Sequence, residues 1–241
     1  MQSRIVPLGD QGLQIQFEEK LDPEINSRVH QAADLIMSSG TQGIKEVIPA
    51  FRTLTVLYDP IDIDFQTLSY RLKPLIDDIG RVDRQTKKVV EIPVCYDKTF
   101  GLDLASISMA KKLPIDEIIR RHSQHDYLIY MLGFLPGFAY LGGLDHTIAM
   151  PRLDEPRIKI PAGSVGIAGQ QTGIYPLDSP GGWRLIGATP VKLFNPTQSP
   201  HVPYQAGDYI RFKPIDRSTY ENIANQVETG TYHLRINEVK E

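Results

Sequence analysis

The chain has 241 residues, of which 41% are hydrophobic and 23% charged, and its formal net charge is −3. This composition provides enough apolar side chains for a buried core, and the slightly negative charge argues against a protein that coats nucleic acid or an anionic membrane. At roughly 150 residues per domain, the length predicts one or two domains.

The sequence lacks the patterns of a disulfide-bonded, zinc-binding, secreted or membrane-spanning protein. Cys95 is the only cysteine, so no internal disulfide forms, and its place in VVEIPVCY predicts a buried strand residue. No Cys or further His stands at zinc-binding spacing from His122 and His125, so we expect no metal site. The N-terminal MQSRIVPLGD lacks the apolar segment of a signal peptide, and no apolar run has the length of a membrane span, which predicts a cytoplasmic protein.

The first 80 residues alternate between strand and helix patterns. The expected strands are 3–8, 13–17, 44–49 and 53–58. Asp22-Pro23 predicts the start of a helix that Gly40 ends, and Asp62 or Asp64 predicts the start of a second helix that Gly80 ends. Two strands, a helix, two strands and a helix predict a small α/β sandwich of the split-βαβ kind.

The string RVDRQTKK (81–88) contains almost no apolar residue. We interpret it as a surface link between two domains, 1–84 and 85–241, although an ordinary charged loop has the same composition.

Short strands dominate the second domain. The expected strands are 89–96, 126–132, 164–168, 185–186, 191–194 and 209–212, and the expected helices are 102–111, 114–123 and 218–227. Many short strands separated by turn signals predict a closed or nearly closed β-barrel, so the fold class of the whole chain is α+β.

Glycine is concentrated in residues 133–187, which hold 11 of the 19 glycines. Aromatic and branched residues lie between them, so this segment is not a flexible linker. Such loops can present backbone N–H groups to an anion, and a small barrel also needs glycine at its corners and bulges.

Two strings in this segment, GFLPGFAYLGGL (133–144) and PRLDEPRIKIPAGSVGIAGQQTGIYPLDSPGGWRLIGATP (151–190), resemble the signature of the allophanate hydrolase subunit 1 family. The resemblance runs from LGDQGLQIQF near the N-terminus to AGDYIRF (206–212). One departure is Ala188, which stands where we expect an arginine in a G-R-T-P string.

The resemblance implies a C-terminal cyclophilin-like β-barrel and a choice of two functions. The first is the B subunit of an ATP-dependent 5-oxoprolinase, which hydrolyses 5-oxo-L-proline to L-glutamate with the C and A subunits and with ATP and Mg²⁺, held by this chain or by a partner. The second is an inhibitor of sporulation histidine kinase A. The lactam chemistry requires anion clamps and a means of orienting water.

The expected anion-binding residues are cations beside the glycine-rich loops. They are Arg152, Arg157, Lys159 and Arg184. The alternative is that these charges form surface ion pairs with Asp154, Glu155 and Asp178.

The turn at 169–172 and one histidine complete the expected catalytic and substrate-binding set. Gln170 and Gln171 are candidates to orient water or the lactam amide, flanked by Gly169 and Thr172, or else they are ordinary residues of an exposed turn. His122, at the end of an expected helix, is a candidate acid or base, or else a helix-capping residue.

The string GFLPGFAYLGGL also predicts a surface for a partner, either another enzyme subunit or a kinase. Its aromatic residues are Phe134, Phe138 and Tyr140. For Tyr140, as for Trp183, core packing is the alternative.

Overall fold

The computed structural model describes residues 3–20, 22–77, 79 and 86–240. The chain divides into two compact units, Met1–Arg84 and Gln85–Glu241, which we propose as its two domains. The expected helix end at Gly80 and positions 81–85 of the expected link lie outside the described residues, whereas 86–88 begin a strand.

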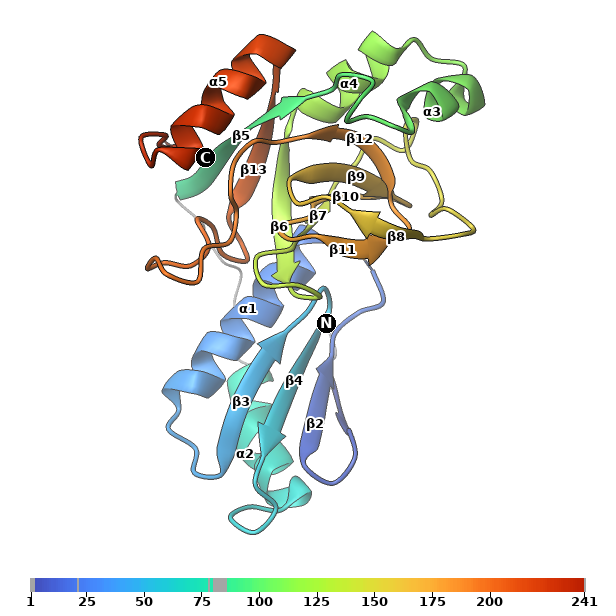
Figure 1. Cartoon of the computed structure of the whole chain (residues 1–241). Coiled ribbons are helices and arrows are strands. Elements are labelled where there is room, and N and C mark those ends of the chain that lie inside the picture. Colours follow the sequence, from blue (N-terminus) through green and yellow to red (C-terminus); the bar gives the residue numbers. More distant parts are fainter. Residues whose placement is uncertain (1–2, 21, 78, 80–85, 241) are drawn as a thin grey trace. The chain divides into compact units, whose positions relative to one another are not determined.

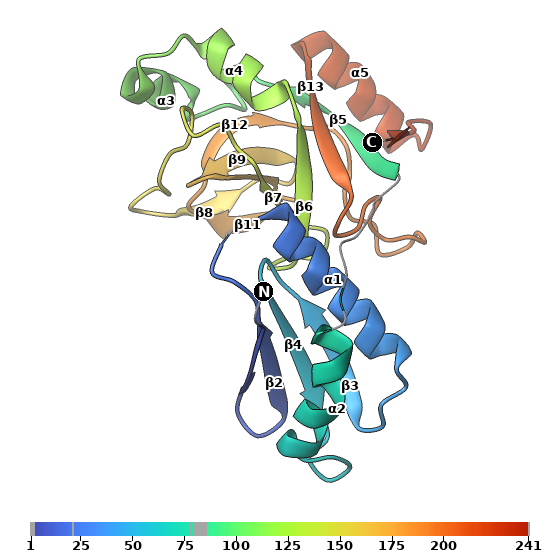
Figure 2. The same cartoon turned by 180° about the vertical axis from the view of Figure 1, so that it is seen from behind.

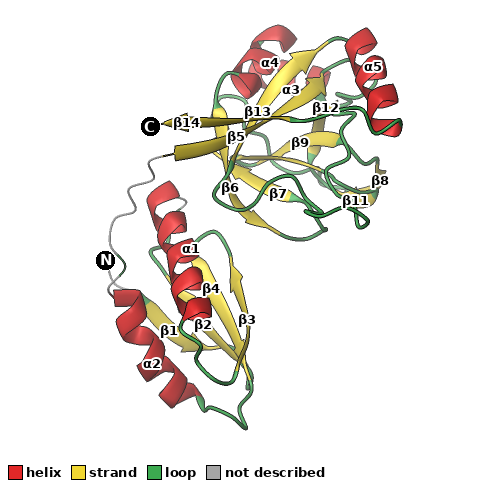
Figure 3. Cartoon of the chain, turned by 90° about the vertical axis from the view of Figure 1, so that its left-hand side faces the viewer, coloured by secondary structure: helices red, strands yellow, loops and turns green. Residues whose placement is uncertain are grey.

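The first unit is a four-stranded sheet with two helices. Both helices cover the same face of the sheet (Figures 2 and 3). Its elements are β1 (Arg4–Pro7), β2 (Gly12–Gln16), α1 (Pro23–Ser38), β3 (Ile44–Pro49), β4 (Thr53–Tyr58) and α2 (Phe65–Asp77). The strand order is β1-β2-β4-β3 and every pair is antiparallel, so β2 and β3 run parallel with β4 between them. The unit β2-α1-β3 is therefore a split βαβ, as the sequence predicts.

Aspartate caps begin both helices of this unit. The backbone N–H of Glu24 donates to Asp22 at 2.9 Å, with Pro23 as the first helical residue, and the N–H of Thr67 donates to Asp64 at 2.8 Å. Each cap satisfies one donor that the first helical turn leaves unpaired. Of the two starts expected for the second helix, Asp64 is the one observed.

The second unit is built on a closed barrel of seven strands (Figure 1). The barrel order is β12-β9-β10-β7-β6-β13-β5, and β5 pairs back to β12. These strands are β5 (Thr86–Cys95), β6 (Asp126–Leu132), β7 (Ala139–Gly142), β9 (Ser164–Ala168), β10 (Gln171–Ile174), β12 (Arg184–Ala188) and β13 (Tyr209–Ile215). The α+β fold class with a C-terminal barrel is confirmed.

Further elements surround the barrel. They are α3 (Leu104–Lys111), α4 (Ile115–Ser123), α5 (Arg217–Glu228), an additional strand β14 (Arg235–Lys240) paired with β5, and a two-stranded sheet of β8 (Arg157–Ile160) and β11 (Ser179–Gly181). The strand expected at 191–194 is wrong: this segment pairs with no strand among the described residues, although Val191 and Leu193 pack into the barrel core.

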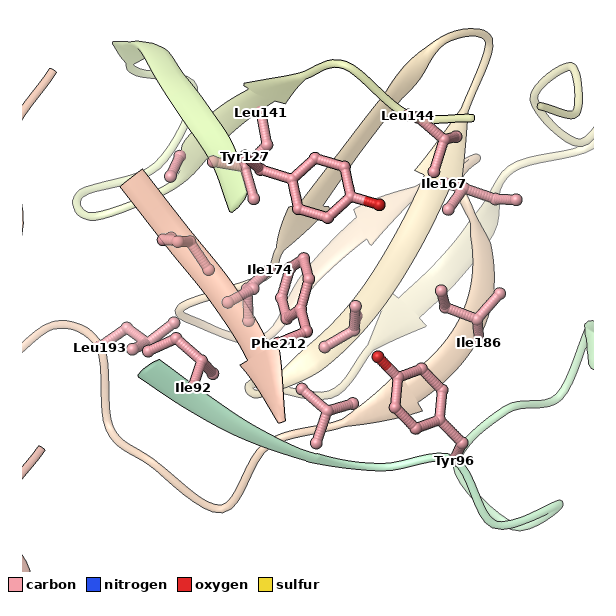
Figure 4. Close-up of a cluster of buried hydrophobic side chains, with 14 of the residues drawn as sticks. Ile92, Tyr96, Tyr127, Leu141, Leu144, Ile167, Ile174, Ile186, Leu193 and Phe212 are labelled. Atoms are coloured by element: carbon pink, nitrogen blue, oxygen red, sulfur yellow. The ribbon is translucent and has the colours of Figure 1, made fainter. Parts of the chain in front are cut away.

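Apolar side chains fill the barrel, and ten of them are labelled in Figure 4. Fully buried examples come from every wall: Val90, Ile92 and Val94 of β5, Ile129 of β6, Leu141 of β7, Ile167 of β9, Ile174 of β10, Ile186 of β12 and Phe212 of β13. Barrels of this size enclose room for side chains and no channel. Cys95 is 2% exposed, as expected for a buried strand residue.

The barrel closes through a close contact between β12 and β5, where Ala188 pairs with Cys95. A Cβ atom on Gly187 would lie 2.8 Å from the Cys95 carbonyl oxygen and 2.9 Å from Val94 Cγ1. Any side chain at this position must push the two strands apart.

We therefore expect Gly187→Ala to lower the free energy of unfolding by about 1–3 kcal/mol, the usual cost of overpacking a core. Gly182→Ala is the matched control, because a Cβ there would meet nothing closer than 3.6 Å. Urea denaturation of both variants measures the difference. Equal stability of the two would contradict this account of closure.

Candidate functional site

The glycine-rich strings build a second apolar core on the outer wall of the barrel. Phe138, Tyr175 and Trp183 are at most 4% exposed and pack with each other at ring-centroid distances of 5.3–6.4 Å. A Cβ on Gly173 would lie 3.1 Å from the Trp183 ring and 3.3 Å from the Phe138 ring. Glycine here makes room for aromatic rings, and Trp183 is a core residue.

Two of the four expected anion-binding cations are held by carboxylates. Arg157 Nη2 donates to Asp103 Oδ1 at 2.9 Å, and Lys159 lies 2.9 Å from Asp178. For Lys159 the surface-pair alternative is the observed arrangement. Asp103, which sequence reasoning missed, is 7% exposed and also accepts from the backbone N–H of Leu185 at 2.6 Å.

The other two cations, Arg152 and Arg184, come from different segments that meet at Pro151. Arg184 Nε donates to the carbonyl of Pro151 at 3.0 Å, next to Arg152. Arg152 is exposed and has neither a hydrogen bond nor an ion pair with the part of the chain that the structure describes. Burial raises the pKa of Tyr140, and the positive charge of Arg152 opposes that rise.

The turn that carries Gln170 lies beside the chain at Met150, just before Arg152. Ala168 pairs with Gln171 across the β9–β10 hairpin, so Gly169 and Gln170 form its two-residue turn. Gly169 has φ +57°, which suits glycine at the first turn position. Its N–H donates to the Met150 carbonyl at 2.7 Å, which brings the turn to the chain just before Arg152. The structure thus brings together Arg152, Arg184 and the turn, with Gln170 exposed and Gln171 half-buried.

His122 lies inside the barrel, away from this surface. It is fully buried and stacks on Phe212 at 4.5 Å between ring centroids. Its Nδ1 lies 2.8 Å from the Tyr96 hydroxyl, and its Nε2 lies 2.8 Å from Thr172 Oγ1. Thr172 donates to the carbonyl of Gly166 at 3.0 Å, so its oxygen accepts from Nε2–H and Tyr96 donates to Nδ1.

This network satisfies a neutral imidazole completely. Burial, with a smaller contribution from His125, lowers the pKa of His122 to about 3. Tyr127, whose hydroxyl donates to the His122 carbonyl at 2.8 Å, holds the end of α4 against the barrel. The geometry favours a structural role for His122 and Thr172 over the acid–base and substrate-binding roles expected from the sequence, since both are 0% exposed.

The buried His122 predicts a pH dependence of stability. Unfolding restores its ordinary pKa of 6.5 from about 3, so between these values the unfolded chain binds the extra proton. The free energy of unfolding should therefore fall with falling pH in this window, by about 1.4 kcal/mol per pH unit.

In His122→Gln this slope should be lost, whereas His201→Gln, a change at an exposed side chain, should keep it. Chemical denaturation at about pH 6 and about pH 5 checks the prediction. Parallel pH dependences in wild type and His122→Gln would show that the histidine is not the linked group.

The predicted partner surface is only partly exposed. Phe134 is 63% exposed, Tyr140 is half-buried, and Phe138 is 1% exposed and therefore supports the surface from beneath. Of the three residues expected there, Phe138 is placed in the core.

Three hollows lie elsewhere and are not lined by the residues expected in the site. One of about 590 Å³ is formed by residues of β1 and α2, one of about 280 Å³ lies before and along α2, and one of about 310 Å³ lies near Cys95 and Arg217. Among the described residues there is no group of three or more His, Cys, Asp or Glu that could hold a metal ion, and no helix has the length and apolarity needed to cross a membrane.

Comparison with known families gives a match over residues 3–204 to the family described as "Carboxyltransferase domain, subdomain C and D". The chain belongs to this family. It is 41% identical to the B subunit of 5-oxoprolinase from Bacillus subtilis over 90% of this chain and 95% of the relative, and 44% identical to that of Haemophilus influenzae over 71% and 79%. These relatives confirm the resemblance expected from the sequence.

Solved structures agree with the fold. The protein PH0987 from Pyrococcus horikoshii is 43% identical, with a TM-score of 0.54, over 90% of this chain and all of that one. TTHA0988 is 33% identical, with a TM-score of 0.75, over 86% of this chain and 40% of that one. The K. lactis urea amidolyase shares the fold, with a TM-score of 0.82, over 98% of this chain and 16% of that one.

Proposed function

We propose that this chain is the B subunit of an ATP-dependent 5-oxoprolinase, in which it contributes to the hydrolysis of 5-oxo-L-proline to L-glutamate together with the A and C subunits. The observation that carries the proposal is the identity of 34–44% to three proteins named as the B subunit of 5-oxoprolinase, over 71–90% of this chain. No contact described above favours the kinase-inhibitor alternative.

Within this function, Arg152 is the residue we propose to bind the substrate carboxylate. It is the exposed cation of the predicted set that has no partner among the described residues, and a guanidinium binds a carboxylate with two parallel hydrogen bonds. Arg184, whose Nε donates to the carbonyl of Pro151, adds positive charge, and we propose that the amide of Gln170 on the adjacent turn hydrogen-bonds the lactam.

We propose that a partner subunit holds most of the ATP and Mg²⁺ site. A phosphate cradle needs several free backbone N–H groups, and Gly166, Gly173 and Gly187 instead lie in paired barrel strands. Ala188, in place of the expected arginine, is 6% exposed and pairs with Cys95, so it adds no cation to the site. The chemistry that ATP supplies is activation of the lactam oxygen as a leaving group.

Reconstitution tests the proposed function. The purified chain and the purified A and C subunits together should release glutamate from 5-oxoproline with ATP, and omission of this chain should abolish the release. An unchanged rate without this chain would reject the assignment.

In the reconstituted enzyme, Arg152→Ala should raise the KM for 5-oxoproline about 10-fold or more, the value of one charge-assisted interaction, with no change in the melting temperature. Arg71→Ala, at an exposed arginine of α2, is the control and should keep the wild-type KM. Arg157→Ala should instead lower the melting temperature, because it leaves the buried Asp103 without its cation. An unchanged KM in Arg152→Ala would remove this residue from the site.

A further inference from the structure

The loop between β6 and β7 holds one aromatic side chain, Phe134, exposed to solvent. Phe134 is 63% exposed and has φ +68°, a left-handed backbone conformation that bulky residues rarely adopt. Both the exposed ring and the backbone conformation cost free energy in the isolated chain. Strain of this kind persists where the surrounding structure enforces it.

The surrounding structure does enforce it. The Gly133 N–H donates to the Phe138 carbonyl at 3.1 Å, and the Phe138 N–H donates to the Leu135 carbonyl at 3.0 Å. The hydroxyl of the buried Tyr204 donates to the Gly137 carbonyl at 2.7 Å. These bonds fix the loop at both ends and leave little freedom for Phe134 to turn inward.

A buried ring supports the exposed one. Phe134 stands edge-on to Phe138, with ring centroids 5.8 Å apart and an interplanar angle of 89°. Phe138 is itself fixed in the outer aromatic core by Tyr175 and Trp183. An aromatic residue that is already ordered loses little entropy on binding, which is the property of an interface hot spot.

The chemistry of the loop points to an apolar partner surface. The string GFLPGF (133–138) carries no charge. A complementary binding site on a partner would be an apolar pocket that takes one phenyl ring, with a rim that need not be charged.

The family comparisons supply the argument for one partner. The matched family covers subdomains C and D of a carboxyltransferase domain, so its other subdomains lie outside the matched residues. Relatives named as subunits have nearly this length, with 95% of the Bacillus subtilis protein covered, whereas this chain corresponds to only 40% of TTHA0988. In TTHA0988 the same module is thus covalently joined to further polypeptide.

We propose that Phe134 is the anchor by which this chain binds the enzyme subunit homologous to the remaining part of TTHA0988. This inference rests on the proposed function, because it assumes that the two proteins are parts of the same complex. It assigns the docking contact to Phe134 and gives Phe138 a supporting role beneath it.

The test uses biolayer interferometry to measure the affinity of the purified chain for that subunit in purified form. Phe134→Ala should raise the dissociation constant about 30-fold or more, the loss of affinity typical of a hot spot. Tyr70→Ala, at an 82% exposed aromatic residue of α2, is the matched control and should change the constant by less than about threefold.

Phe134→Gly separates docking from folding. Glycine adopts the positive φ without strain, so this variant should melt at or above the wild-type temperature and still lose affinity as Phe134→Ala does. Wild-type affinity in both Phe134 variants would overturn the docking site and leave the proposed enzymatic function intact. If the wild-type chain binds no such protein and adds nothing to glutamate release, both proposals are overturned.

Discussion

The barrel closes where β12 meets β5, and the contact exists because position 187 carries no side chain. Closure leaves an interior that holds only side chains, so each polar group inside needs a partner there. His122 meets this requirement because Tyr96 and Thr172 satisfy its two ring nitrogens. The closed wall therefore favours a structural role for this histidine, and the proposed binding residues lie on the outer surface.

Two residues of the glycine-rich region differ from the expected site residues around them. Arg157 and Lys159 have carboxylate partners, whereas Arg152 has none among the described residues. Phe138 and Trp183 are buried in the outer core, whereas Phe134 is held in solvent. In the proposed function, Arg152 offers a charge to a small anion and Phe134 offers a ring to a protein, so the two proposals place substrate and partner recognition in the same glycine-rich region.

Local signals account for what the sequence predicted well. Aspartate caps, glycine turns and apolar alternation act within a few residues, and they located both N-terminal helices and most strands. Strand β10 was missed because it has only four residues, Gln171–Ile174, and Gly173, a residue depleted in strands, interrupts it; its pairing with β9 holds it in place. The ion pair of Arg157 with Asp103 joins residues 54 positions apart, and the sequence around either residue does not predict it. Burial of His122 likewise depends on the closed barrel and not on its helix.

The pairing of β5 also has a consequence for biosynthesis. This first strand of the barrel pairs with β12, β13 and β14, all of which come from residues 184–240. The N-terminal sheet, by contrast, is complete once residue 58 has emerged from the ribosome. The first unit can therefore fold during translation. Strand β5, by contrast, has no pairing partners until almost the whole chain has been made. In that interval its apolar side chains and unpaired edges need protection from aggregation.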